Sequence, residues 1–422
     1  MLTNKIFSAF QSKNYRLYFF GQSVSLIGTW MQRTAVYWLI YVETNSAFML
    51  GVAVFCAQFP SFLLSVVGGV VSDRYNRFNV LLKTQFASLI QAVLLTILVF
   101  SGDYEVWHIL ALSVVLGSIN AFDVPARQSL VYDMVDQKEH LPNAIALNSS
   151  MVNVARLIGP ALSGLVLEEF GAEICFLINS LSFVAVIISL YAMKLPAFIP
   201  RERITNVATD LKEGLAYLKA TPDIRKVILL LTIISLVSLP YITLLPVYAK
   251  EVFKGDAFIF GLLNSFVGIG AVTGALFLAS LSAGSNLKKI LSICTLIFGA
   301  GLLAFAFIEL LPFALLFIAI AGFGMMSQTT ITNTIIQTTV APAMRGRVIS
   351  YYAMAFFGMQ PLGSLLIGTL AHYIGAPLTI FLQGVLTIII ALVFIQFLQP
   401  GLFKKKQKMK LSQLEEQTVE SM

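Results

Sequence analysis

Long runs of hydrophobic residues, separated by short polar segments, dominate the chain. Each run is about as long as the roughly 20 residues with which an α-helix crosses the hydrocarbon core of a membrane. The pattern therefore predicts twelve membrane-spanning helices in two sets of six. They cover residues 15–42, 47–72, 79–101, 107–133, 145–168 and 173–194, and then residues 227–249, 258–283, 289–309, 312–341, 348–373 and 377–399.

The composition agrees with an all-α polytopic membrane protein. Hydrophobic residues make up 58% of the chain, charged residues only 12%, and the mean hydropathy is +0.84, which lies far outside the soluble range. Cys56, Cys175 and Cys294 fall in three different predicted helices without CxxC spacing, so neither a disulfide framework nor a metal site is expected. The amino-terminal segment MLTNKIFSAFQSKN lacks a signal-peptide cleavage pattern, so the first helix is expected to be retained.

The distribution of basic residues predicts the orientation in the membrane, because cationic loops stay in the cytoplasm. With the amino terminus inside, the outer loops hold only Lys250 and Lys254 of the 28 lysines and arginines. Both termini are therefore expected in the cytoplasm, and the protein in the inner (cell) membrane of a bacterium. The net charge of +7 then reflects topology, and no nucleic-acid partner is expected.

The chain divides into four predicted parts. Residues 1–194 and 227–400 form two six-helix bundles, 195–226 a cytoplasmic linker, and 401–422 a basic and then acidic cytoplasmic tail. Apolar residues at helical spacing from Val207 to Leu218 predict an amphipathic linker helix, either on the inner membrane surface or in solvent. An offset of about 205 residues relates the bundles and places Asp123 opposite Gln328, which makes the halves pseudo-symmetric.

Four ionisable residues lie deep in the predicted spans, where charge is costly and usually faces a cavity or a partner: Arg33, Asp123, Arg127 and Arg156. Asp123 and Arg127, four apart on one helix face, predict a local ion pair. Asp123 lies 16 residues before the turn near residue 139 and Arg156 lies 17 residues after it, so their similar depth predicts an ionic bridge between the fourth and fifth helices. These charged residues either take part in coupling transport to an energy source or form a purely structural ion pair between helices.

Arg33 has no acid at its depth, so it is a candidate ligand for an anion, or else it reaches the outer surface. Three arginines against one aspartate leave about two surplus positive charges. That surplus suits an acidic or catecholate cargo better than a lipophilic cation. Trp30, Tyr37, Trp38 and Phe122 could accommodate rings or simply pack between helices.

The loop between the second and third predicted helices contains Gly69, Asp73, Arg74 and Arg77 in the pattern GxxxDRxxR. With twelve spans and a long central loop, the sequence resembles the major facilitator superfamily over essentially its whole length. The glycine would allow close approach of a neighbouring helix, and the two arginines would hold the loop inside. The resemblance implies that Asp73 faces the start of helix eleven.

Helix eleven begins just after Met344-Arg345-Gly346-Arg347. Pairing of Asp73 with Arg345 or Arg347 would latch the cytoplasmic side shut. The alternative is that these charges only anchor a tight loop.

Residues 29–51, 143–164 and 341–350 are similar to the transmembrane secretion effector and enterobactin-exporter-like branch of this superfamily. The run GPALSG at 159–164 partly resembles the antiporter signature of drug exporters, which favours efflux. The resemblance also implies that helices one, four, seven and ten line the cavity. The candidate lining residues are then Gln22, Thr29, Gln32, Arg33, Tyr37, Asn120, Asp123, Tyr241, Thr243, Gln328, Thr332 and Asn333.

The source of energy follows from what the sequence lacks. It has no GxxxxGK loop followed by Ser or Thr, so no nucleotide and no other cofactor is expected. Asp123 is the one deep carboxylate available as a proton carrier; otherwise coupling runs through the charge of the cargo, or through Glu43 or Asp133. His108, His140 and His372 are scattered, so an enzyme is not expected, and paired kinked halves favour a carrier over a channel.

These features predict a monomeric, proton-linked exporter of a small amphiphilic, anionic compound such as a siderophore. The alternatives are a multidrug or macrolide exporter, or a lipid or metabolite carrier of the same fold.

Overall fold

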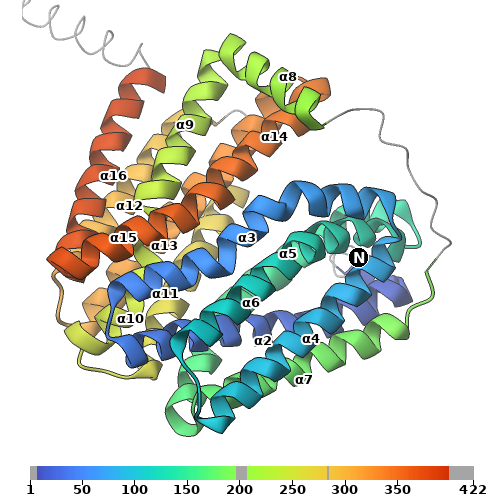
Figure 1. The fold of residues 1–422 in the computed structure, drawn as a ribbon. Helices are drawn as coiled ribbons and strands as arrows, with labels where there is room; N and C mark the ends of the chain where they lie inside the picture. Colours follow the sequence, from blue (N-terminus) through green and yellow to red (C-terminus); the bar gives the residue numbers. More distant parts are fainter. Residues whose placement is uncertain (1–6, 196–206, 283–284, 399–422) are drawn as a thin grey trace, which may run out of the picture.

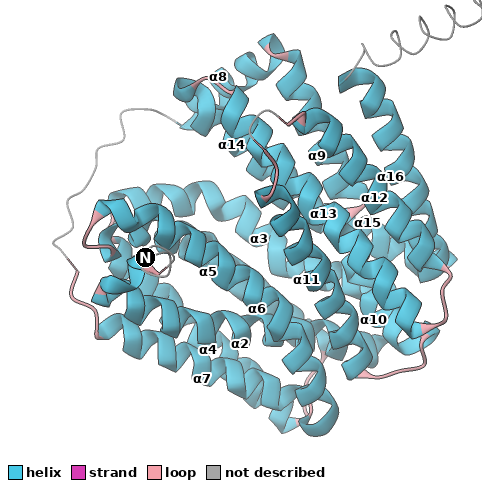
Figure 2. Ribbon diagram, turned by 180° about the vertical axis from the view of Figure 1, so that it is seen from behind, coloured by secondary structure: helices cyan, strands magenta, loops and turns pink. Residues whose placement is uncertain are grey.

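The computed structural model describes residues 7–195, 207–282 and 285–398, so the predicted tail at 401–422 lies outside the described residues. Every regular element among them is a helix (Figure 2). The first bundle contains α2 (Lys13–Thr44), α3 (Ala47–Arg74), α4 (Arg77–Ser101), α5 (Val106–Met134), α6 (Leu141–Phe170) and α7 (Ala172–Tyr191), with the short turns η1 (Ser8–Gln11) and η2 (Lys138–His140).

The second bundle starts with a broken helix made of α9 (Pro222–Val237), η3 (Leu239–Leu244), α10 (Leu245–Val247) and η4 (Tyr248–Val252). It continues with α11 (Ala257–Ala279), α12 (Leu287–Ala306), α13 (Leu311–Thr339) and the short η5 (Pro342–Met344). A second interrupted helix follows, made of α14 (Arg345–Ala353), η6 (Met354–Gly358) and α15 (Met359–Ile374), and α16 (Ala376–Leu398) is last. Pro240 and Pro246 are the second residues of η3 and α10, where the helix changes its geometry, because proline has no N–H to donate to the preceding turn.

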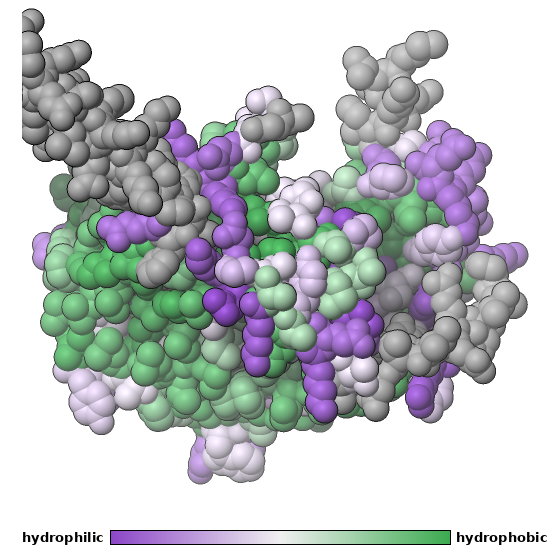
Figure 3. All heavy atoms as spheres, turned by 90° about the horizontal axis from the view of Figure 1, so that it is seen from above, coloured by the Kyte–Doolittle hydropathy of each residue, from purple (hydrophilic) through white to green (hydrophobic). Residues whose placement is uncertain are grey.

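The twelve predicted spans are confirmed. Eleven helical segments of the described chain are long and apolar enough to cross a membrane, and α2 is the twelfth long helix. Its lower hydropathy has a visible cause, since it buries Gln22, Gln32 and Thr34 inside the protein instead of exposing them to lipid. Seen from the end where α8 lies, hydrophilic residues gather toward the middle of the face and one flank is hydrophobic (Figure 3).

The two bundles meet along two seams, α3 against α15 and α6 against α11 (Figure 1). Glycines make both crossings close. A Cβ atom on Gly368 would lie 3.0 Å from the Cα atom of Gly51, and one on Gly164 would lie 3.1 Å from the Cα atom of Gly261. Small residues let helix backbones approach in this way inside a membrane.

The close approach predicted for Gly69 is made by Gly68 instead, so that prediction was wrong. A Cβ atom on Gly68 would lie 1.9 Å from the carbonyl oxygen of Ala121 on α5, whereas nothing lies within 4 Å of one on Gly69. Consecutive residues of an α-helix point about 100° apart, so only one of two neighbouring glycines faces a given helix.

The linker helix α8 (Val207–Ala220) forms as predicted and packs on α14 of the second bundle. Leu218 is buried in a cluster with Ile228 and Val348, and the Tyr351 hydroxyl donates to the Leu211 carbonyl oxygen at 2.9 Å. Protein, and not only lipid or solvent, therefore covers the apolar face of α8. We call the end of the molecule that carries α8 the α8 end.

Candidate functional site

Two arginines from different helices contact one tryptophan ring in the first bundle. The guanidinium carbon of Arg33 lies 5.1 Å from the ring centroid of Trp30, and that of Arg156 lies 5.3 Å from it. Gly159 brings α6 this close to α2, because a Cβ atom there would lie 2.5 Å from the Cβ atom of Trp30. The indole π-face attracts each cation, which partly offsets their mutual repulsion.

Two tyrosines complete this group. Arg33 Nε donates to the Tyr37 hydroxyl at 3.2 Å and also lies over that ring. Arg156 interacts electrostatically with Arg33 and with Tyr241, which comes from η3 of the second bundle. We call Trp30, Arg33, Tyr37, Arg156 and Tyr241 the arginine–tryptophan cluster; both bundles contribute to it.

The cluster has unused hydrogen-bonding capacity. Arg156 Nε is buried without a hydrogen-bond partner among the described residues, and so is the hydroxyl of the fully buried Tyr241. Neither Arg33 nor Arg156 forms an ion pair with any described acid. Buried polar groups normally find partners, so these atoms indicate a place for a ligand or water.

Asp123 lies elsewhere, and the predicted bridge between Asp123 and Arg156 was wrong. Asp123 pairs with Arg127 at 3.4 Å, which confirms the local pair. It also accepts hydrogen bonds from the Thr84 hydroxyl at 2.9 Å and the Gln85 amide at 2.6 Å. Equal distance from a turn predicts equal height but not rotation: α5 turns Asp123 toward α4, while α6 packs mainly on α2 and α11.

The other predicted lining residues are not gathered at the cluster by any contact of the described residues. Gln32 belongs to the core of the first bundle, where it donates to Gln91 and accepts from Asn179. The remaining hydroxyls and amides of this set bond locally or stay unpartnered. Thr29 donates to Ser25 and Thr243 to Ser364, Asn333 accepts from Gln337, Asn120 is partly buried, and Gln22, Gln328 and Thr332 are buried with at least one polar atom unpartnered.

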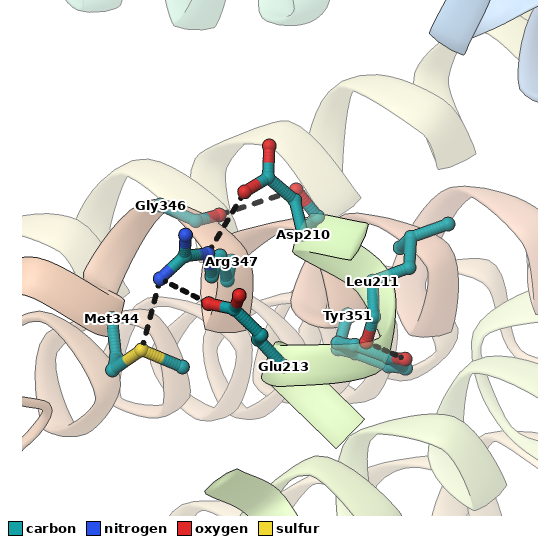
Figure 4. Close-up of polar contacts among 8 residues, drawn as sticks. Asp210, Leu211, Glu213, Met344, Gly346, Arg347 and Tyr351 are labelled. Atoms are coloured by element: carbon teal, nitrogen blue, oxygen red, sulfur yellow. Dashed lines mark hydrogen bonds and ion pairs between the residues drawn. The ribbon is translucent and has the colours of Figure 1, made fainter. Parts of the chain in front are cut away.

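The predicted latch between Asp73 and Arg345 or Arg347 stays a prediction, while other residues of the two loops have described partners. Arg77 pairs with Asp133 at 3.5 Å, Arg74 is exposed, and the side chain of Asp73 lies outside the described residues. Arg347 pairs instead with Asp210 at 2.9 Å and Glu213 at 2.8 Å, both on α8 (Figure 4). Arg345 Nε is buried without a described partner. The sequence analysis missed the acids of α8 as partners, although they stand out as the charged face of an amphipathic helix.

The two bundles are joined at the end opposite α8. The Tyr41 hydroxyl donates to Glu251, Lys250 donates to Asn45 at 3.1 Å, and the Phe258 N–H donates to Glu168 at 3.4 Å. At the α8 end, no hydrogen bond or ion pair joins the bundles within the described ranges. The structure is therefore closed at the opposite end, beyond the cluster.

The fold and this site define a transporter of the major facilitator type. The chain matches the family model of the transmembrane secretion effectors over residues 4–422, and it belongs to this family. No group of three or more His, Cys, Asp or Glu that could hold a metal ion exists in the described part of the chain.

Relatives agree with this assignment, and a solved structure agrees with the fold. The chain is 30% identical to a staphyloferrin A transporter of Staphylococcus aureus (strain NCTC 8325 / PS 47), over 89% of this chain and 94% of that protein. It is 25% identical to macrolide efflux protein A of Streptococcus pyogenes, over 90% and 96%. A POT family transporter in complex with 5-aminolevulinic acid has the same fold, with a TM-score of 0.73 and 13% identity over 92% of this chain and 96% of that one.

Proposed function

We propose that this chain is a secondary active exporter of a small amphiphilic anion, such as a siderophore, in the inner (cell) membrane of a bacterium. The observation that carries the proposal is the pair of guanidiniums of Arg33 and Arg156 on one indole, without an acid partner among the described residues. Such groups bind carboxylates or other oxyanions strongly, since hydrogen bonds between ions are stronger than neutral ones. The staphyloferrin A transporter among the relatives supports this class of cargo.

Alternating access is the proposed mechanism. The α8 end is taken as cytoplasmic, with both termini on that side. The protein acts as a monomer, in which the bundles 1–194 and 227–400 move as two rigid units relative to each other. Cargo enters from the α8 end, its anionic groups bind Arg33 and Arg156, and its apolar part packs on Trp30 and Tyr37. Contact with Tyr241 then links the bundles through the cargo. The bundles then close at the α8 end, Tyr41 separates from Glu251 at the opposite end, and the cargo is released to the outside.

A multidrug or macrolide exporter is the second candidate. The macrolide efflux protein A and a multidrug efflux pump Tap of Mycolicibacterium fortuitum support it, the latter at 22% identity over 81% of this chain and 85% of that protein. The aromatic rings of the cluster would also accept such compounds. The charge of the cluster favours an anion, because two guanidiniums repel a lipophilic cation.

Complementation tests the proposal. A strain that lacks the protein is complemented with wild type, Arg156→Gln or the charge-preserving Arg156→Lys, and iron-chelating activity is measured in cells and medium. We expect chelator to accumulate in the deletion strain, with export restored by wild type and largely by R156K but not by R156Q. Unchanged chelator export together with altered susceptibility to dyes and antibiotics would favour the second candidate.

A further inference from the structure

The empty protein carries uncompensated charge well inside the membrane-spanning region. Arg33 is part of the long helix α2 and Arg156 of the span Lys138–Phe170, each more than two turns from the helix ends. Neither pairs with an acid among the described residues, and each is held by an aromatic ring instead. A ring stabilises a cation but does not neutralise it, so the site keeps two positive charges when empty.

No acid in the described part of the chain is available to cancel them. Asp123, the one described carboxylate deep in a span, is already engaged by Arg127, Thr84 and Gln85. Every other described carboxylate lies in a loop, in α8 or near the end of a helix, such as Glu43, Asp133, Glu168, Glu173 and Glu251. The compensating charge therefore has to come from the cargo.

The membrane potential acts on such charges even if the side chains hardly move. The protein is closed at the end opposite α8, where Tyr41 contacts Glu251 and Lys250 contacts Asn45. Water that enters from the α8 end then brings the cluster close to the potential of that side. Opening the other end places the same charges close to the potential of the other side, so the conformational change itself carries charge through the field.

We infer that Arg33 and Arg156 are the charges through which the membrane potential drives transport, and that the cargo they select carries two negative charges. The inference rests on the proposed export of an anion. With a dianion bound, the site is neutral and the loaded protein reorients without moving net charge. The empty protein returns with two positive charges, pulled inward by the negative interior.

The charge balance closes over one cycle. Two positive charges move inward on the empty protein for each dianion that leaves, and this equals two negative charges moved outward. Each charge supports an accumulation ratio of about 50-fold at a potential of about 100 mV, and two charges support about 2,500-fold. A proton carrier is then not needed, and Asp123 keeps its structural pairing with Arg127 throughout.

A voltage-step measurement without any cargo tests this directly. Full-length protein in a planar bilayer at equal pH on both sides should show a transient, saturating charge displacement. Arg33→Gln and Arg156→Gln should each reduce the displaced charge by about half, whereas Arg33→Lys and Arg156→Lys should retain it. Lys254→Gln, in the loop before α11, is the matched control and should leave the displacement unchanged. Displacement that survives in the double glutamine variant would overturn the inference.

A flux measurement separates this inference from the proposed function. Proteoliposomes loaded at alkaline pH with fluorescein, which is then an aromatic dianion, should release the dye faster when a potassium diffusion potential makes the lumen negative. Dye release by wild type that ignores the imposed potential would overturn the inference and leave anion export standing. Charge displacement without dye release would instead contradict the proposed cargo class, and the absence of both would contradict both.

Discussion

Arg33 on α2 and Arg156 on α6 contact the same indole ring, at 5.1 and 5.3 Å from its centroid, although they lie far apart in the chain. Two like charges are brought together in a region where one is already costly. A fold that only needed stability would hold an acid there. The arrangement is explained if a bound anion supplies the missing charge.

The glycines of the loop motif give a prediction about packing. Gly68→Ala places a methyl group against the Ala121 carbonyl oxygen and should cost about 1–3 kcal/mol, as overpacking typically does. Gly69→Ala is the matched control in the next position. Nothing lies near its Cβ, so it should be neutral or stabilising by up to about 1 kcal/mol, because alanine favours the helix. Thermal unfolding in detergent measures both, and equal effects would contradict the assignment.

Asp123 gives a prediction about stability. Asp123→Asn removes the charge partner of Arg127, and we expect a loss of about 2 kcal/mol, below the usual cost of a broken buried pair because Arg127 keeps 17% exposure. Asp123→Asn with Arg127→Gln should recover part of that loss. A loss of stability in the double variant that equals or exceeds the sum of the two single losses would exclude a direct pair. Because Asp123 lies away from the cluster, D123N should still bind anions.

The docking of α8 gives a prediction about local dynamics. Arg347→Gln removes the ion pairs to Asp210 and Glu213, so α8 should exchange its amide hydrogens about 10-fold faster, since one charge-assisted hydrogen bond contributes about 1.5–3 kcal/mol. Lys219→Gln, at an exposed position of α8, removes the same charge and should leave exchange unchanged. Hydrogen exchange followed by mass spectrometry measures these rates. Equal exchange rates of α8 in R347Q and wild type would show that the two ion pairs do not stabilise its docking.

The helices and the depth of the charged residues in the membrane could be predicted from the sequence. Span length alone predicted the twelve long helices, and the lack of an acid near Arg33 pointed to a free cation. It failed on rotation about the helix axis, which decides whether Gly68 or Gly69 faces α5 and whether Asp123 faces α4 or α6. Those choices depend on which helices pack together, and the consecutive helices α5 and α6 hardly touch, whereas α4 and α5 pack closely.

Contacts between residues from distant segments of the chain could not be predicted from the sequence either. Arg347 meets the acids of α8 only because the linker folds back on α14, and Tyr241 reaches the cluster only because the bundles meet. The broken helix around Pro240 was read as one continuous span, since hydropathy does not register a change from α to 3-10 geometry.

The most direct test of the central claim compares two dyes with related ring systems and opposite charge. Anionic carboxyfluorescein and a cationic rhodamine are titrated into purified protein, with fluorescence anisotropy as the readout, for wild type, Arg156→Gln and Arg156→Lys. We predict that wild type binds the anion at least about 10-fold more tightly than the cation, that R156Q weakens anion binding by about 10-fold, or about 1.4 kcal/mol, and that R156K retains most of it. Equal or tighter binding of the cation by wild type, or anion binding that R156Q leaves unchanged, would contradict the account.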